Sequence, residues 1–319
     1  MLILIILCKR HKMYKGGTMK NRKLVILAVI LIVILLVFVT LISLKNTKPK
    51  EVITIRDELE FKYSKEGSYD VGYIEHESSN LKTGKYSIWY PMKMEDKRYP
   101  VIVIANGTGA TAETHKDVFK HLASWGFIVI GNEDKNSWTG ESTFLSLEHI
   151  LQINNNKDSI LYNKIDTNKI GVSGHSQGGV GAINAVCNYE NSNYFKSIYT
   201  ASCASIEVSS MLGWEYDTNQ INIPYFMSAG TGDIDAGLIA PLDSLENAYN
   251  DIKSRKLTVM GRKKGVDHRE VLKEGKGYMV AWFLATLNED NEAKKVFYGR
   301  NSEIQINTEH WQDVQIKNN

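Results

Sequence analysis

The chain contains few cysteines and prolines and has no strong net charge. Its 319 residues include three cysteines and five prolines, and its charged side chains sum to +2 at pH 7. Cys8, Cys187 and Cys203 show no CxxC or other metal-ligand spacing, so we expect neither a metal site nor a disulfide framework. We interpret Cys187 and Cys203 as free thiols, with pairing outside the cell as the alternative. The near-neutral charge, without a basic stretch interleaved with aromatics, argues against a nucleic-acid partner.

One long uncharged run stands out near the N-terminus. Leu24–Leu44 has no charged residue, and about 20 apolar residues cross a bilayer. Several lysines and arginines precede the run, so residues 1–23 are expected in the cytoplasm. We therefore predict an uncleaved, single-pass signal anchor in the cell membrane, with the rest of the chain extracytoplasmic. A cleaved signal peptide is disfavoured because the run exceeds a usual apolar core and no A-x-A-like site follows it. Met19 would also make a normal start, with residues 1–18 as a mis-assigned extension.

The rest of the chain alternates short apolar runs with helix-compatible segments. Residues 45–66 are a charged linker, residues 67–288 form one domain, and residues 289–319 are a polar tail in this interpretation. The alternation predicts an α/β fold with a mainly parallel sheet covered by helices on both faces. The expected strands are Ser68–Ile74, Tyr86–Tyr90, Val101–Ala105, Phe127–Gly131, Lys169–Ser173, Phe195–Ala201, Pro224–Ala229 and Leu257–Gly261. The expected helices are Thr114–Ser124, Ser142–Gln152, Val180–Val186, Pro241–Ser254 and Lys273–Leu287.

A nucleophile motif lies between one of these strands and the helix after it. The sequence Gly174-His175-Ser176-Gln177-Gly178 matches Gly-x-Ser-x-Gly, the nucleophile elbow of α/β-hydrolases. The elbow holds its serine in a strained backbone conformation, and glycines on both sides keep Cβ atoms away from the neighbouring strand and helix. Ser176 is therefore the candidate nucleophile.

A serine hydroxyl needs a base, and the base needs an orienting carboxylate. In this fold the chain order is serine, acid, histidine. Only His268 and His310 follow with room for an acid between, and His310 lies in the predicted tail, so His268 is the expected base. The acid should follow the strand Pro224–Ala229, where Asp233 is our first choice and Asp235 our second.

The oxyanion hole needs two backbone N–H donors. The residue after the nucleophile, Gln177, supplies one at the start of a helix, where the dipole also favours negative charge. The second should come from the loop after strand Val101–Ala105, where Thr108 is our choice.

The same loop offers a rival interpretation. Gly107-Thr108-Gly109-Ala110-Thr111-Ala112 also matches G-x-G-x-x-A, and Tyr249 with Lys253 matches the Tyr-x-x-x-Lys pair of short-chain dehydrogenases. An NAD(P)-dependent dehydrogenase would leave Ser176 and His268 without a role, and it would need a nicotinamide cofactor outside the membrane. A peptidase or acyltransferase that uses the same triad is another alternative, and the non-enzymatic one is a surface binding module on a hydrolase scaffold. It gives no reason to retain all three triad positions.

Taken together, the motifs resemble the α/β-hydrolases around bacterial cutinases, polyester hydrolases and chlorophyllase-like esterases. The residues that carry the resemblance are Tyr99–Ile104, Asn106–Thr108, Leu122–Ile130, Ile165–Val172, Gly174–Gly179, Ile223–Pro224, Gly232–Asp233 and Val266–His268. The resemblance implies carboxylic-ester hydrolysis through an acyl-enzyme, with Ser176, Asp233 and His268 as the triad and with Thr108 and Gln177 as the oxyanion donors.

The triad mechanism requires no metal, and the sequence has no H-E-x-x-H or similar cluster, so we expect neither a metal nor a cofactor. The expected substrate is a small-molecule, lipid or polyester ester. Three departures from the family pattern weaken the case for polyester. His175 stands where polyester hydrolases more often carry tryptophan, Gln177 stands in place of methionine, and their paired C-terminal cysteines are absent. We expect His175 to have a packing role.

Overall fold

The computed structural model describes residues 58–318. The predicted membrane anchor Leu24–Leu44, the N-terminal segment before it and most of the predicted linker lie outside these residues. The described residues belong to one compact unit, Ile53–Asn319. Between residues 58 and 318, no helix has both the length and the apolar character needed to span a membrane.

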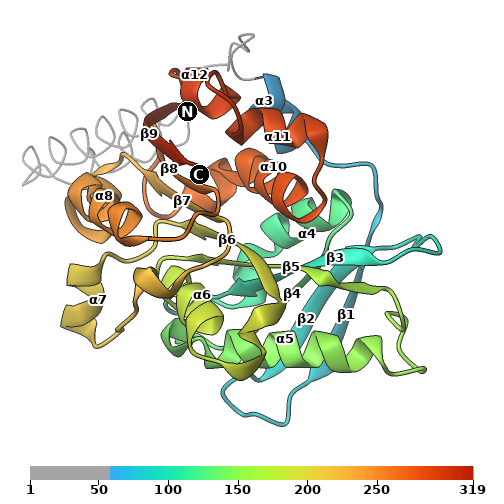
Figure 1. The fold of residues 1–319 in the computed structure, drawn as a ribbon. Helices are drawn as coiled ribbons and strands as arrows, with labels where there is room; N and C mark the ends of the chain where they lie inside the picture. The colour runs from blue at the N-terminus through green and yellow to red at the C-terminus, as the bar shows by residue number, and fades with distance from the viewer. Residues whose placement is uncertain (1–57, 319) are drawn as a thin grey trace, which may run out of the picture. The chain divides into compact units, whose positions relative to one another are not determined.

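The described chain is built on a nine-stranded mixed sheet with the order β1-β2-β4-β3-β5-β6-β7-β8-β9 (Figure 1). The strands are β1 (Val71–Glu77), β2 (Lys85–Pro91), β3 (Tyr99–Ala105), β4 (Ile128–Asn132), β5 (Ile165–His175), β6 (Phe195–Ala201), β7 (Tyr225–Gly230), β8 (Thr258–Lys263) and β9 (Trp311–Lys317). From β4 to β8 neighbouring strands pair in parallel, whereas β1, β2 and β9 pair antiparallel at the two edges. The parallel centre follows from runs such as Val101–Ile104, which are apolar throughout and buried on both sides.

Helices cover both faces of the sheet, as the alternating pattern predicts. The helices are α3 (Glu58–Ser64), α4 (Lys116–Ser124), α5 (Glu141–Asn154), α6 (Gln177–Cys187), α7 (Ile206–Leu212), α8 (Leu242–Asp251), α9 (Val271–Glu274), α10 (Lys276–Leu287), α11 (Asn291–Phe297) and α12 (Glu303–Ile306). Short helical turns are η1 (Ala112–His115), η2 (Ser137–Thr139), η3 (Glu190–Tyr194), η4 (Thr218–Gln220) and η5 (Asp235–Ile239). One apolar core packs α5, α6 and α8 on one face, and a second packs α3, α4, α10 and α11 on the other.

The C-terminal segment differs from the polar tail that the sequence suggests. Residues 289–318 form α11, α12 and the edge strand β9, which pairs with β8. Trp311 on β9 is 1 % exposed and stacks on Tyr278 of α10 with ring centroids 5.2 Å apart. Helix α3, which falls inside the predicted linker, packs against α10. These segments are short and lack a clear apolar period, so their burial comes from tertiary contacts that local patterns do not report.

A buried polar network joins the two ends of the described chain. Glu303 accepts hydrogen bonds from the backbone N–H groups of Leu59 and Glu60, at 2.8 and 2.7 Å, and so caps the first turn of α3. The Glu60 carboxylate in turn accepts from Trp311 Nε1 at 2.9 Å, from Asn307 Nδ2 at 2.7 Å and from Lys263 Nζ. The network fastens the first described helix to the last strand.

Candidate active site

The strand-to-helix turn between β5 and α6 has the geometry of a nucleophile elbow. Ser176 lies at the tip with φ 58° and ψ −126°, a conformation that non-glycine residues rarely adopt. A Cβ atom on Gly174 would lie 1.9 Å from the Gly178 carbonyl oxygen, so the turn closes only with glycine at position 174. The elbow prediction therefore agrees with the backbone, and Ser176 is half-buried at the sheet edge where the parallel strands end.

His268 lies in the loop after β8 and reaches the serine. Its Nε2 is 3.0 Å from Ser176 Oγ, within hydrogen-bond distance. Asp267 fixes this loop, because its Oδ1 accepts from the backbone N–H of His268 at 2.8 Å and from that of Asp235 at 3.2 Å. Asp267 thus joins the loops after β7 and β8, a role that the sequence alone did not suggest.

The carboxylate that meets His268 is Asp235, which corrects our first choice of Asp233. Asp235 Oδ1 lies 2.7 Å from His268 Nδ1, and the Asp235 side chain is fully buried. Asp233 is exposed and makes no hydrogen bond to His268. The two residues differ in burial: Asp235, the first residue of the π-helical turn η5, is buried and accepts a hydrogen bond from Gly230 at the end of β7, whereas Asp233, two residues earlier, is exposed.

Asp235 is held by donors on both oxygens. Oδ2 accepts from the Ser202 hydroxyl at 2.5 Å and from the Gly230 N–H at 2.7 Å. Burial alone would raise the pKa of Asp235, but the hydrogen bonds from His268, Ser202 and Gly230 outweigh it and hold the pKa below its ordinary value. Asp235 is therefore ionised at neutral pH and fixes His268 with its Nδ1–H toward the carboxylate.

Ser202 is a site residue that sequence reasoning missed. It follows β6, is fully buried, and has φ 45°, in the left-handed region that favours glycine. Its N–H donates to Ser228 O at 2.7 Å, and the preceding residue, Ala201, accepts from Ser176 N–H at 3.0 Å. The same short turn therefore contacts the backbone of the nucleophile and the side chain of the acid. A single serine after a strand carries no sequence signal that would have revealed this.

The loop after β3 passes directly over the elbow. Asn106 anchors it, because its Nδ2 donates to Asn132 O at 2.8 Å and to Asp134 O at 2.9 Å. A Cβ atom on Gly107 would lie 3.1 Å from the His175 carbonyl oxygen, so glycine allows this close approach. The next residue, Thr108, is exposed and is carried to the elbow by Gly107.

Two backbone donors at this point have no partner in the protein. Within residues 58–318, neither the Thr108 N–H nor the Gln177 N–H donates a hydrogen bond to a protein acceptor. Gln177 is the first residue of α6, so its N–H lies at the positive end of a helix dipole. Unpaired N–H groups on either side of a nucleophile suit an oxyanion.

His175 is buried beside His268 instead of pointing at the substrate side. Its Nε2–H donates to the His268 carbonyl oxygen, with the two atoms 2.7 Å apart, and the two rings lie 4.6 Å apart. Burial lowers the pKa of His175 to about 3, and the neighbouring His268 adds to this effect, so His175 is neutral. The expected packing role thus extends to fixing the backbone of His268.

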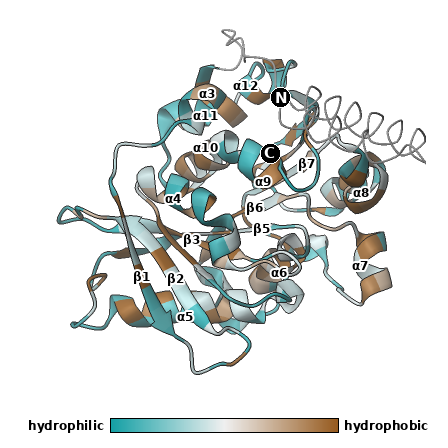
Figure 2. Cartoon of the chain, turned by 180° about the vertical axis from the view of Figure 1, so that it is seen from behind, coloured by the Kyte–Doolittle hydropathy of each residue, from teal (hydrophilic) through white to brown (hydrophobic). Residues whose placement is uncertain are grey.

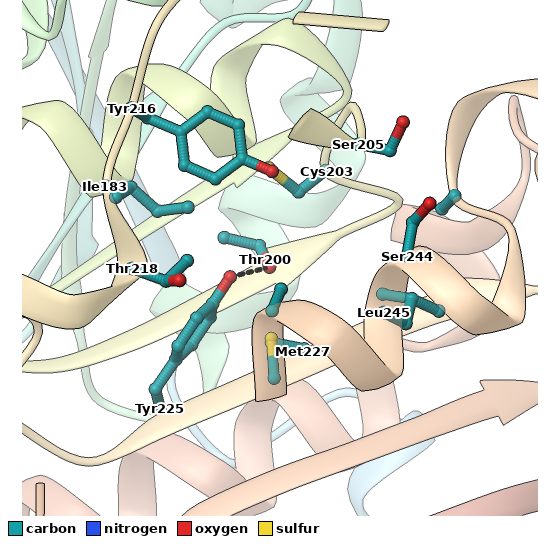
Figure 3. A pocket seen from close by; sticks show the side chains of 12 residues that line it. Ile183, Thr200, Cys203, Ser205, Tyr216, Thr218, Tyr225, Met227, Ser244 and Leu245 are labelled. Carbon is teal, nitrogen blue, oxygen red and sulfur yellow. Dashed lines mark hydrogen bonds between the residues drawn. The ribbon is translucent and has the colours of Figure 1, made fainter. Parts of the chain in front are cut away.

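A small cavity lies behind the elbow, between α6, α8 and the strands β6 and β7 (Figure 3). Cys203, Tyr216 and Tyr225 contribute to its lining, and Tyr225 OH lies 2.9 Å from Thr200 Oγ1. Its volume of about 20 Å³ holds roughly one water molecule, so it is too small for an ester substrate. Burial raises the pKa of the Cys203 thiol, which makes this cysteine unreactive. Cys187 and Cys203 are both unpaired.

Two other features weighed in the sequence, a metal cluster and the dehydrogenase motif, can be looked for within residues 58–318. Among the residues that the structure describes, no group of three or more His, Cys, Asp or Glu side chains is placed to hold a metal ion. Tyr249 of the dehydrogenase interpretation is buried in the core, and its ring contacts Lys317 Nζ of β9 at 4.2 Å. Gly107, which that interpretation assigns to a pyrophosphate, is occupied by its contact with the elbow.

The mixed α/β sheet, the elbow and the Ser176–His268–Asp235 alignment define an α/β-hydrolase. A family model described as PETase, PET hydrolase-like, matches residues 63–314. The chain therefore belongs to the PET hydrolase-like family, which confirms the resemblance to cutinases and polyester hydrolases and supports an ester hydrolase.

Proposed function

We propose that the protein hydrolyses carboxylic esters through an acyl-enzyme, with Ser176 as nucleophile, His268 as general base and acid, and Asp235 as the orienting carboxylate. The observation that carries the proposal is the unbroken hydrogen-bonded line from Ser176 Oγ to His268 Nε2 at 3.0 Å and from His268 Nδ1 to Asp235 Oδ1 at 2.7 Å. A binding module would gain nothing from a buried carboxylate aligned on an imidazole that contacts a strained serine.

In this mechanism His268 takes the Ser176 proton as Oγ attacks the ester carbonyl carbon. The Thr108 and Gln177 N–H groups donate to the oxyanion of the tetrahedral intermediate. The intermediate collapses as His268 gives the proton to the leaving alcohol, which leaves an acyl group on Ser176. Water, deprotonated by His268, then attacks the acyl carbon, and the acid departs while Ser176 regains its proton. Asp235 stabilises the imidazolium in both halves of the cycle.

The site of action is part of the proposal. The uncharged run Leu24–Leu44, with basic residues before it, supports a single-pass anchor that holds the hydrolase domain outside the cytoplasm. Accessibility of the domain to added protease in intact cells, compared with cells made permeable, tests this placement.

Initial rates on p-nitrophenyl esters of increasing acyl length test the activity. We expect wild-type turnover that falls by about 10⁴-fold in Ser176→Ala and in His268→Ala, because triad members act as a unit. Undiminished turnover in Ser176→Ala, or none in a folded wild type across the series, would contradict the proposal. An aromatic polyester film added to the panel shows whether this chain shares the activity for which its family is described.

A further inference from the structure

Exposed apolar side chains gather at one place on the described surface. Five of the ten large hydrophobic residues that are exposed within residues 58–318 lie in the segments after β6 and β7. We call this group the rim patch; its members are Ile206, Met211, Leu212, Ile234 and Leu238. Met211 is 75 % exposed and Leu212 is 54 % exposed. Figure 2 shows α7, which carries three of the five, as a strongly hydrophobic helix at the margin of the domain. Apolar surface gathered in this way marks an interaction site.

The rim patch adjoins the proposed catalytic residues. Strands β5 to β8 are parallel, so the segments that follow them share one edge of the sheet with Ser176. The Ala204 N–H lies 3.4 Å from the Ser176 carbonyl oxygen, and Ser205 N–H donates to Ile239 O at 2.8 Å, which joins the start of α7 to the end of η5. The turn η5 itself begins with Asp235. Whatever covers the rim patch therefore lies beside the entrance to the serine.

The charge around the rim patch indicates the chemistry of its partner. From residue 197 to residue 252, the stretch that includes every member of the rim patch, the sequence contains eight acidic residues and no lysine, arginine or histidine. The one charged residue of α7, Glu207, accepts a hydrogen bond from Ser244 Oγ at 2.9 Å. Segments with this charge do not attract anionic headgroups, so they associate with a surface through burial of apolar area. An uncharged apolar interface is the partner that fits.

The rest of the chain places such an interface within reach. Only residues 45–57 separate the uncharged run Leu24–Leu44 from the start of α3 at Glu58. Fully extended, this connection spans at most about 45 Å, so an anchored domain stays close to the bilayer. Tethering raises the effective concentration of the rim patch at that surface without any further contact.

We propose that the rim patch docks on the bilayer that holds the anchor, and that the natural substrate is an acyl ester dissolved in this bilayer. Docking would bring Ser176 to the lipid surface, so that an ester enters the site directly from the membrane without crossing water. The inference rests on the proposed ester-hydrolase function and names its substrate class. It also requires that docking depend on apolar contact and not on anionic lipid.

The test uses the full chain reconstituted in phosphatidylcholine vesicles. Two rates are measured for each variant, one on water-soluble p-nitrophenyl acetate and one on a fluorogenic long-chain diacyl ester embedded in the bilayer. The rim variant is the triple change Met211→Ser, Leu212→Ser, Leu238→Ser. The matched control, Leu81→Ser, Met92→Ser, Ile160→Ser, removes apolar side chains that are at least as exposed elsewhere on the domain. Thermal unfolding of each variant verifies its fold.

We expect the hydrolysis rate of the rim variant on the embedded ester to fall about tenfold, because docking is weakened. Its rate on the soluble ester should stay within about twofold of wild type, because the reaction itself does not depend on docking. The control should change neither rate. Adding phosphatidylglycerol to the vesicles should not raise the wild-type rate on the embedded ester, because the segments that carry the rim patch have acidic and no basic residues. Equal losses of the rim variant on both substrates, no loss on either, or a strong gain with anionic lipid would overturn the inference.

A second measurement does not depend on activity. A fluorophore attached at Met211→Cys, in a chain with Cys8 and Cys187 changed to serine, should be quenched by nitroxide-labelled lipids, whereas one at Leu81→Cys should not. In the other outcome, the emission of the fluorophore at position 211 reports an apolar environment while the labelled lipids do not quench it. In that case a protein or another part of this chain covers the rim patch, which also overturns the inference. If wild type is inactive on both esters but position 211 is quenched, the proposed function fails and the docking stands.

Discussion

Two buried acidic residues, Asp235 and Glu60, have similar hydrogen-bonded surroundings, but Asp235 contributes to the proposed reaction and Glu60 to the stability of the fold. Each accepts three hydrogen bonds with both of its oxygens engaged. The three donors to Glu60 join α3 to β8, through Lys263, and to the C-terminal segment, through Asn307 and Trp311, all more than 200 residues away in sequence. One donor to Asp235 is His268, whose other ring nitrogen faces Ser176 Oγ. A buried carboxylate therefore serves catalysis only where one of its donors is also in contact with a reactive group.

The largest expected effect separates Asp235 from its neighbour Asp233. Asp235→Asn keeps the shape of the side chain but loses the charge that stabilises the imidazolium and favours the wrong ring tautomer, so kcat should fall by about 10⁴-fold. Asp233→Asn, two residues earlier and exposed, should leave kcat within about twofold. Steady-state rates on a soluble ester measure both. A large loss in Asp233→Asn with activity retained in Asp235→Asn would reverse our assignment.

Removing the Glu60 carboxylate should lower the stability of the fold and leave the rate of the reaction unchanged. Glu60→Ala leaves buried Lys263 Nζ and Trp311 Nε1 without their acceptor, and leaves Asn307 Nδ2 with Tyr278 Oη as its acceptor, which should cost about 3 kcal/mol of the free energy of unfolding. Urea titration measures the loss, and kcat at a temperature where the variant is folded should match wild type. Glu75→Ala, which removes an exposed pair with Lys85, serves as control and should change stability little. A folded Glu60→Ala variant with strongly reduced kcat would show that Glu60, like Asp235, contributes to the reaction.

Ser202 provides an intermediate case, since it is buried and acts on the reaction only through Asp235. Ser202→Ala removes one donor to Oδ2, so we expect kcat/KM to fall about tenfold, and the pKa of Asp235 to rise. The acid limb of the pH–rate profile should then move to higher pH, which a purely structural defect would not cause. Ser202→Gly relieves the positive φ but also lacks the hydroxyl, and it should show the same shift. An unshifted profile in both variants would exclude this positioning role.

The smallest effect comes from two imidazoles, half-buried His149 and buried His121, that, like Glu60, influence folding alone. Burial, reinforced by His76, lowers the pKa of His149 to about 4, and burial, reinforced by Lys276, lowers that of His121 to about 4. Unfolding returns both toward 6.5, so between pH 6.5 and 4 the unfolded state binds more protons than the folded state. The stabilisation is complete above about pH 6.5 and is lost as the pH falls toward 4. The Tm measured from pH 8 to 4 should decline across this window, and His149→Gln should reduce the slope. A Tm that is constant across the window would contradict the assignment.

Much of the site could be predicted because its signals are local. The elbow depends on glycine spacing around Ser176, and His268 follows from chain order. Strand β6 was predicted at its observed bounds, Phe195–Ala201, because a short apolar run bounded by polar residues leaves little choice. Strand β5 extends beyond the predicted Lys169–Ser173 at both ends, and β1 begins and ends later than the predicted Ser68–Ile74, since pairing with a neighbouring strand, and not the apolar run alone, sets where a strand begins and ends.

What escaped prediction depends on contacts between distant segments. Asp233 and Asp235 carry the same signal in the sequence, and only the direction of the η5 turn decides which one reaches His268. The C-terminal segment reads as polar because it contributes single buried side chains such as Trp311 in place of an apolar stripe. Ser202 has a left-handed backbone conformation, with φ 45°, that no sequence pattern predicts.

Covalent labelling by a fluorophosphonate tests the central claim most directly. The reagent reacts with a serine only where a base activates the hydroxyl and an oxyanion hole receives the phosphoryl oxygen. We predict one adduct per folded chain by intact mass, located on Ser176 by peptide mapping, and none in Ser176→Ala. A folded wild-type protein that takes up no label, or takes it up at another residue, would contradict the account.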